Sequence, residues 1–146
     1  MFTEQKIVSV LGGQASLGRK IKNTLDLDKL IREGFPYKAG SHVRDLLNLP
    51  LPLFAGIIEV SERTLARVRK SPNQRLSTVA SDRLYRLARI FSIACEVLEN
   101  EDKAREWLRR QQVGLGGKTP FDLLHTEAGA KEVEDLLWRI EYGVIS

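Results

Sequence analysis

Apolar residues recur along most of the chain at the three- and four-residue spacing of amphipathic helices. Only residues 6–13, KIVSVLGG, alternate briefly between apolar and polar positions, and this stretch ends in two glycines. The later pattern predicts helices over residues 26–34, 38–49, 50–60, 61–70, 77–100 and 101–110, and a last helix after Thr126. The sequence therefore predicts an all-α fold.

The long helix predicted over residues 77–100 is apolar on two sides. One stripe consists of Leu84, Leu87, Ala88, Phe91, Cys95 and Leu98, and the nearly opposite side carries Ile90, Ile93 and Val97. A helix with two apolar sides is typical of the central member of a bundle. On this interpretation Cys95 is a small, buried apolar residue.

The composition favours a folded intracellular protein. The chain has 146 residues, a length sufficient for one domain or two small ones. Of these residues 42% are hydrophobic and 29% charged, a composition too apolar for a disordered chain. No apolar run reaches the roughly 18 residues of a membrane span, and the N-terminus lacks the pattern of a signal peptide. A single cysteine excludes an internal disulfide. We expect a cytoplasmic protein with no membrane segment.

The net charge of +4 is divided unevenly along the chain. Residues 1–76 carry 13 Lys and Arg against 7 Asp and Glu, whereas residues 77–146 carry 10 against 12. Such a division indicates a basic half that meets an anion, although chance distribution of surface charge is the alternative. The polar connector at residues 71–76 contains Pro72 and predicts a domain boundary.

Residues 52–70 have the spacing of a helix-turn-helix. Ala55 stands where two crossing helices need a small residue, Ser61 where the second helix needs a cap, and Leu65 where it needs a core residue. Val60 is the apolar residue of the turn. The turn usually holds a left-handed glycine, and here it holds Glu59, which adds strain of about 1 kcal/mol and a negative charge.

The exposed face of this second helix is basic. Arg63, Arg67 and Lys70 lie on the side opposite Leu65 and Val68, as a recognition helix in the DNA major groove requires. Further phosphate contacts are predicted from Ser61, Thr64 and Arg69. The alternative is a small helical domain with a solvated basic face. Because one short helix reads few bases, we also expect a homodimer on its operator DNA.

The last helix also has two apolar faces. Its predicted core face consists of Val133, Leu136, Leu137, Ile140 and Val144, and its far face of Trp138, Tyr142 and Ile145. An exposed Trp and Tyr are typical of a protein–protein hot spot. The alternatives are that the two halves of the chain pack here, or that the aromatic rings lie half-exposed.

The C-terminal segment KTPFDLLHTEAGAKEVEDLLWRIEYGVIS resembles the toxin-binding domain of Xre/ParS/MbcA-type antitoxins, which are paired with RES-domain toxins. The similar positions are Gly117, Pro120, Leu123, Leu124, Thr126, Glu127, Gly129 and Gly143-Val144-Ile145. EVSERTLARVRK and LSTVASDRLYRLARI are similar to the family's Xre-like helix-turn-helix domain and its junction. The resemblance extends from about residue 25 to the end and implies a DNA-binding domain at 25–73 and a helical toxin-binding domain at 77–146. Residues 1–24 precede it and are expected to form an N-terminal arm.

The resemblance also implies a function. In this family the antitoxin neutralises a toxin that consumes NAD⁺, its C-terminal end blocks the toxin's active site, and its N-terminal domain represses the shared operon. The implied toxin-binding residues are Trp138, Tyr142, Gly143, Val144, Ile145 and Ser146. Gly143 would end the helix in a left-handed cap, and the terminal carboxylate of Ser146 would enter a cationic NAD⁺ site.

The sequence contains no recognisable catalytic set, metal-ligand spacing or cofactor motif. Its two histidines, His42 and His125, are read as structural or surface residues. We therefore expect an antitoxin rather than an enzyme. The competing hypotheses are a stand-alone transcription regulator, whose C-terminal domain dimerises or binds a ligand, and a purely structural helical module.

Overall fold

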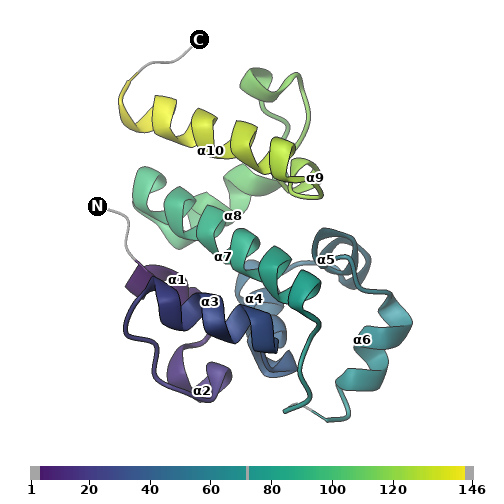
Figure 1. The fold of residues 1–146 in the computed structure, drawn as a ribbon. Helices are drawn as coiled ribbons and strands as arrows, with labels where there is room; N and C mark the ends of the chain where they lie inside the picture. Colours follow the sequence, from purple (N-terminus) through teal and green to yellow (C-terminus); the bar gives the residue numbers. More distant parts are fainter. Residues whose placement is uncertain (1–3, 72, 144–146) are drawn as a thin grey trace. The chain divides into compact units, whose positions relative to one another are not determined.

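The structure is a computed structural model that describes residues 4–71 and 73–143. Within these ranges the structure contains helices and no strand, which confirms the predicted all-α class. Figure 1 shows the elements: α1 Glu4–Val10, α2 Gly13–Leu17, α3 Thr24–Glu33, α4 Tyr37–Leu47, α5 Leu51–Ile58, α6 Glu62–Val68, α7 Thr78–Leu98, α8 Glu101–Arg109, the 3-10 helix η1 Val113–Leu115, α9 Pro120–Leu123 and α10 Glu127–Glu141.

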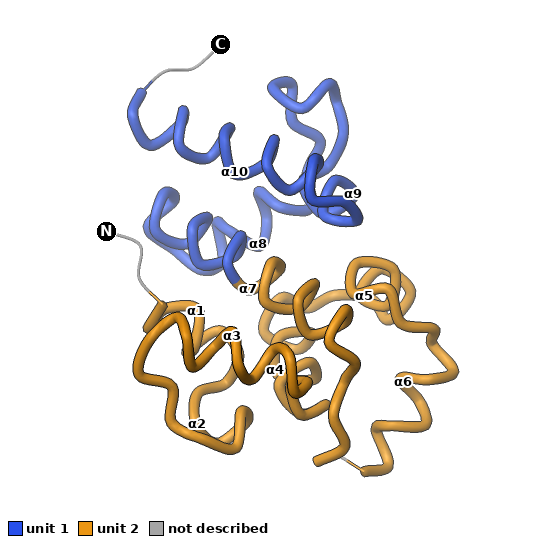
Figure 2. The backbone as a smooth tube through the Cα atoms, in the orientation of Figure 1, with its two compact units in different colours: residues 1–2, 89–146 blue, residues 3–88 orange. Residues whose placement is uncertain are grey.

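The chain divides into two compact units, which are coloured separately in Figure 2. We call residues 3–88 the N-terminal unit and residues 89–146 the C-terminal unit. The division falls inside α7, whereas the sequence placed a boundary at residues 71–76, which the structure shows as the connector between α6 and α7. The domain ranges predicted from the sequence stay a prediction.

The N-terminal unit begins with two short helices that the brief alternation of residues 6–13 did not predict. Ile7 and Leu11 are buried, one helical turn apart, and Leu17 of α2 is buried as well. Both α1 and α2 contact α4. Residues 4–17 therefore belong to the packed core of this unit, because their apolar residues follow a helical rather than a strand period.

The connector after α6 is joined to the segment between α3 and α4. The backbone N–H of Tyr37 donates to the carbonyl of Gln74 at 2.8 Å, and that of Leu76 donates to Phe35 at 2.8 Å. The buried N–H of Phe35 donates to the Ser81 hydroxyl at 2.8 Å. These bonds satisfy backbone groups that would be costly to bury unpaired, and they fix the position of α6 within the N-terminal unit.

Helix α7 is the longest helix of the described residues, with 21 residues. It buries Leu84 and Phe91 from one predicted stripe and Ile90 and Ile93 from the other, as a central helix does. Cys95 is half-buried rather than buried as predicted, because it lies in the last, more exposed turn of the helix. Among the described residues no helix is long and apolar enough to cross a membrane.

The C-terminal unit is organised by side-chain caps. Thr119 accepts from the N–H of Asp122 at 3.1 Å and starts α9, and Thr126 accepts from the N–H of Gly129 at 3.0 Å and starts α10. The Gly-rich stretch before them forms η1 and a turn in which Gly116 and Gly117 are left-handed. This stretch thus forms the turn that separates α8 from α9.

Candidate functional site

The turn between α5 and α6 has the hydrogen bonds of a Schellman cap. The N–H of Glu59 donates to the carbonyl of Gly56 at 3.4 Å, and the N–H of Val60 donates to Ala55 at 3.0 Å. Glu59 has φ 58° and ψ 46°, which confirms the left-handed conformation expected at this position. A residue with a side chain is strained there by about 1 kcal/mol.

The structure shows a partner for Glu59 that the sequence did not reveal. Its carboxylate oxygen lies 3.1 Å from a guanidinium nitrogen of Arg83 in α7. A partly exposed ion pair of this kind contributes about 0.2–1 kcal/mol, which offsets part of the strain. The pair also neutralises a negative charge that would otherwise stand beside the basic face of α6.

The start of α6 is capped as the sequence predicts. The Ser61 hydroxyl accepts from the N–H of Thr64 at 3.0 Å and donates to the Thr64 hydroxyl at 2.9 Å. Both hydroxyls therefore have a local structural role, in addition to the predicted phosphate contacts of Ser61 and Thr64, which stay a prediction.

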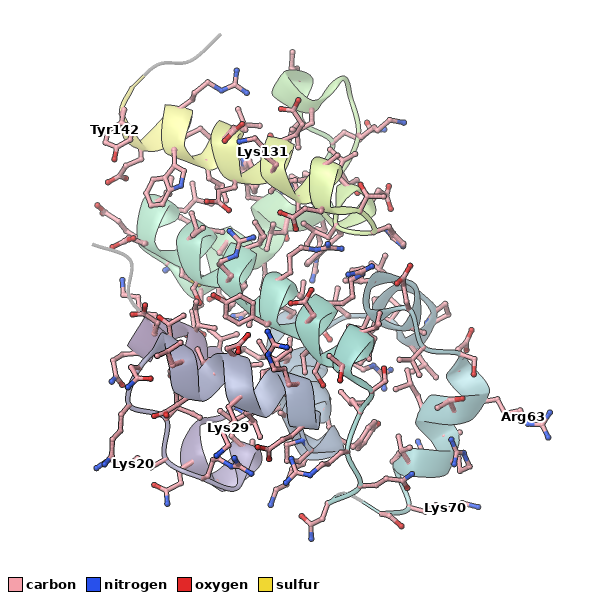
Figure 3. All side chains as sticks on the ribbon, viewed as in Figure 1. Lys20, Lys29, Arg63, Lys70, Lys131 and Tyr142 are labelled. Carbon is pink, nitrogen blue, oxygen red and sulfur yellow. The ribbon has the colours of Figure 1, made fainter. Side chains whose placement is uncertain are left out.

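Helix α6 separates a buried face from a basic face. Leu65 and Val68 are only 2% and 3% exposed. The opposite side chains are exposed, and Figure 3 shows Arg63 and Lys70 pointing away from the ribbon. In the described part of the chain none of the ion pairs involves the exposed cations of this segment, which are Arg63, Arg67, Arg69 and Lys70. These four charges are free to meet an external anion.

In the C-terminal unit, α9 and α10 meet closely at Gly129. A Cβ atom built on Gly129 would lie 2.0 Å from the carbonyl oxygen of Leu123 and 3.1 Å from the Thr126 hydroxyl. Glycine is therefore required by space rather than by backbone angle, since this residue lies inside α10. The contact sets the position of α10, which carries the predicted toxin-binding residues.

We expect Gly129→Ala to destabilise the protein by about 1–3 kcal/mol or more, because a rigid backbone oxygen occupies the space of the new methyl group. The midpoint of thermal unfolding, followed by circular dichroism, measures this loss. The matched control is Ala128→Ser at the adjacent exposed position, which should change stability by less than about 0.5 kcal/mol. An unchanged midpoint for Gly129→Ala would contradict the close approach of the two helices.

The predicted core face of α10 faces inward. Val133, Leu136 and Leu137 are buried, and Ile140 near the helix end is half-buried. An ion pair between Arg89 of α7 and Glu134 joins these two helices within the C-terminal unit. The buried apolar residues and this ion pair therefore hold the core face of α10 within the C-terminal unit.

Trp138 and Tyr142 form an aromatic pair at the end of α10. Their ring centroids are 6.2 Å apart, with an interplanar angle of 27°. Trp138 is half-buried, whereas Tyr142, which is labelled in Figure 3, is 75% exposed. The two rings thus form a stacked aromatic surface at the end of α10 that combines a half-buried and an exposed side chain.

Helix α10 ends where the sequence predicts. The N–H of Gly143 donates to the carbonyl of Ile140 at 3.2 Å, and Gly143 has φ 72°, which confirms its left-handed cap. The helical conformation therefore ends before Gly143. The other predicted toxin-binding residues, Val144, Ile145 and Ser146, lie outside the described residues.

Both histidines take part in backbone hydrogen bonds. Nδ1 of His42 lies 3.0 Å from the carbonyl oxygen of Val10, and Nδ1 of His125 lies 2.9 Å from that of Asp122. These contacts support the structural reading of the two residues. Within residues 4–71 and 73–143 no three or more His, Cys, Asp or Glu side chains gather as a metal site.

Two family models match the chain in succession. The antitoxin Xre-like helix-turn-helix domain matches residues 26–89, and the antitoxin Xre/MbcA/ParS C-terminal toxin-binding domain matches residues 94–143. The first range contains α5 and α6, and the second contains α10 with its aromatic pair. The exposed cations of α6 therefore lie in the first matched range, and Trp138, Tyr142 and Gly143 lie in the second, whereas residues 144–146 lie beyond it.

Sequence comparison with individual proteins shows similarity that extends across both domains. Antitoxin Xre of Photorhabdus laumondii subsp. laumondii is 32% identical over 130 residues, which cover 77% of this chain and 87% of the relative. The chain belongs to the Xre antitoxin family. Antitoxin Xre of Yersinia enterocolitica is 31% identical over 117 residues, which cover 80% of this chain and 78% of the relative. Antitoxin Xre of Pseudomonas putida is 37% identical over 81 residues, which cover 56% of this chain and 50% of the relative.

Membership of the Xre antitoxin family confirms the predicted architecture, an N-terminal helix-turn-helix domain followed by a C-terminal toxin-binding domain. It supports the prediction of a type II antitoxin. Which toxin this Xre antitoxin binds, and which of its residues contact toxin or DNA, stay predictions.

Proposed function

We propose that this Xre-family antitoxin binds and neutralises a RES-domain toxin that degrades NAD⁺, and that it represses its own operon through α6. The observation that carries the first part is the stacked aromatic pair, Trp138 and Tyr142, directly before the left-handed Gly143. Exposed, rigid aromatic residues are the usual anchors of protein interfaces. Their place inside the range matched by the toxin-binding domain supports a toxin as the partner.

Inhibition is assigned to the residues that follow the anchor. Gly143 redirects the chain, so residues 144–146 can enter a cleft of the toxin while the aromatic pair holds α10 on its surface. A cleft that binds the pyrophosphate of NAD⁺ requires cations. The C-terminal unit carries 8 Lys and Arg against 11 Asp and Glu, and this negative balance supports its approach to such a surface.

The second part of the proposal rests on α6. Arg63, Arg67 and Lys70 are exposed on one face, and the buried Leu65 and Val68 hold the opposite face against the unit. A helix with this arrangement can lie in the major groove and contact both base edges and phosphates. Ser61, Thr64 and Arg69 flank it and are proposed as phosphate contacts.

We also propose that the protein acts as a homodimer, because two recognition helices one turn of DNA apart give a useful specificity. Light scattering at micromolar concentration should give about twice the mass of one chain. A protein that remains monomeric both free and on operator DNA would contradict this proposal.

Co-expression tests the proposed function. Cells that produce a RES-domain toxin, encoded beside this gene, should lose NAD⁺ and stop growing, and production of this protein should restore both. An unrelated helix-turn-helix protein is the control. If the protein binds operator DNA but neither binds the toxin nor restores NAD⁺, it is a stand-alone regulator and the antitoxin proposal is wrong.

A further inference from the structure

Three cations act on a single carboxylate at the end of α3 in the N-terminal unit. Nη2 of Arg19 lies 2.8 Å from Oε1 of Glu33, and Nη1 lies 3.4 Å from Oε2. The hydrogen bond from Arg19 is the main cause that holds the pKa of Glu33 below its ordinary value, and the charges of Arg19, Lys29 and Arg75 lower it further. One negative charge thus faces three positive charges, and a net positive charge remains.

A fourth cation adds to this group. Lys20 directly follows Arg19, is exposed, and projects from the lower margin of the unit in Figure 3, as Lys70 of the α6 segment does. Neither Lys20 nor Lys29 forms an ion pair with any residue that the structure describes. We call Arg19, Lys20, Lys29 and Arg75 the α3 cationic cluster.

The α3 cationic cluster is joined to α6 by the connector of residues 71–76. Nη1 of Arg75 donates to the carbonyl of Gly34 at 2.7 Å, and a backbone bridge pairs Arg75 with Pro36. Arg75 also lines the same surface hollow as Arg67 of α6. Arg75 therefore belongs both to the surroundings of Glu33 and to the edge of the predicted recognition surface.

The charge balance identifies the kind of partner. The N-terminal unit carries 15 Lys and Arg against 8 Asp and Glu, an excess of seven positive charges. Exposed Lys and Arg side chains spread along a surface suit a partner with regularly repeated negative charges, such as the phosphate backbone of DNA. An acidic protein is the other candidate, but continuity with the basic face of α6 favours DNA.

We propose that the α3 cationic cluster is a second DNA-contacting surface, which binds backbone phosphates beside the site that α6 reads. The proposal rests on the proposed DNA binding by α6 and extends it to residues outside the helix-turn-helix. Because phosphates carry no sequence information, the cluster should contribute to affinity and salt dependence but not to sequence preference.

The test compares salt titrations of binding to a fragment of the protein's own upstream region. The variant Lys20→Ala/Lys29→Ala should bind about 10- to 100-fold more weakly near 0.1 M salt, and the slope of log K against log salt should fall by about 2, since each phosphate contact contributes about 0.9. The ratio of operator affinity to unrelated-DNA affinity should be unchanged. The matched control, Lys103→Ala/Lys118→Ala, removes two exposed lysines from the C-terminal unit and should leave DNA binding unchanged.

A second variant has the opposite expected sign. Glu33→Gln removes the negative charge that forms an ion pair with Arg19, so Arg19 becomes available to a phosphate. DNA binding should then become several-fold tighter and its salt slope steeper. Suppose that Lys20→Ala/Lys29→Ala and Glu33→Gln both bind DNA with wild-type affinity and salt slope, while the Arg63/Arg67/Lys70 alanine variant loses binding. This result would overturn the cluster proposal but not the proposed role of α6. Weakened toxin binding with unchanged DNA binding would overturn the cluster proposal as well. If the wild-type protein does not bind the operator, the proposed function of α6 fails together with this proposal.

Discussion

Replacement of Arg63, Arg67 and Lys70 together by alanine is expected to lower operator affinity by at least about 100-fold, because a base-reading arginine alone contributes about 1–3 kcal/mol. These side chains are exposed and make no ion pair within the described residues, so their removal should leave the fold intact. Gel-shift or fluorescence-anisotropy titrations measure the loss, and the single variant Arg67→Ala should account for about 1–3 kcal/mol of it.

Two measurements distinguish a contact of Arg67 with a base from a contact with a backbone phosphate. If Arg67 contacts a base, Arg67→Ala should reduce the preference for operator over unrelated DNA, and if it contacts a phosphate, the salt slope should fall by about 1. The Lys103→Ala/Lys118→Ala variant of the C-terminal unit serves as the control for a general loss of positive charge. Unchanged operator binding by the triple variant would exclude the α6 face from the DNA interface.

The second large effect is expected at the aromatic pair. Tyr142→Ala and Trp138→Ala should each weaken toxin binding by about 2 kcal/mol or more, as truncation of an aromatic anchor does, with little change in DNA binding. Tyr142 is the cleaner test because its side chain is 75% exposed and contributes little to the core. Trp138 is half-buried, so its replacement should also lower stability.

Isothermal titration calorimetry with an inactive form of the toxin measures these affinities. Val113→Ala is the matched control, since Val113 is a 93% exposed apolar residue in the same unit but outside α10. It should bind the toxin as the wild type does. Full affinity in both aromatic variants would remove the pair from the toxin interface.

Local signals in the sequence predicted much of this fold correctly. Ser61 and Thr126 each accept the backbone hydrogen bond that a cap requires, and Gly143 takes the left-handed conformation expected of it. These features depend on a few neighbouring residues, so a single sequence contains the information. The family resemblance, carried by the C-terminal motif, is confirmed by both family models and by the relatives.

Contacts between distant residues could not be read in the same way. The pair of Glu59 with Arg83 and the pair of Arg19 with Glu33 join residues far apart in the chain, and their charges alone do not identify their partners. The role of Arg75 was missed for the same reason, because its place beside Arg67 depends on how the connector folds back toward α3. The sequence predicts which charged side chains are exposed, but only the fold shows which of them form ion pairs.

We propose that residues 144–146 inhibit the toxin while α10 holds the antitoxin on the toxin's surface. The most direct measurement is the NAD⁺ content of cells that co-express the RES-domain toxin with a form of this protein lacking those three residues. The form should still fold and bind operator DNA, yet NAD⁺ should fall and growth should stop, whereas the whole chain keeps both normal. Survival with normal NAD⁺ would contradict the claim and would assign inhibition to the face of α10 or to another surface.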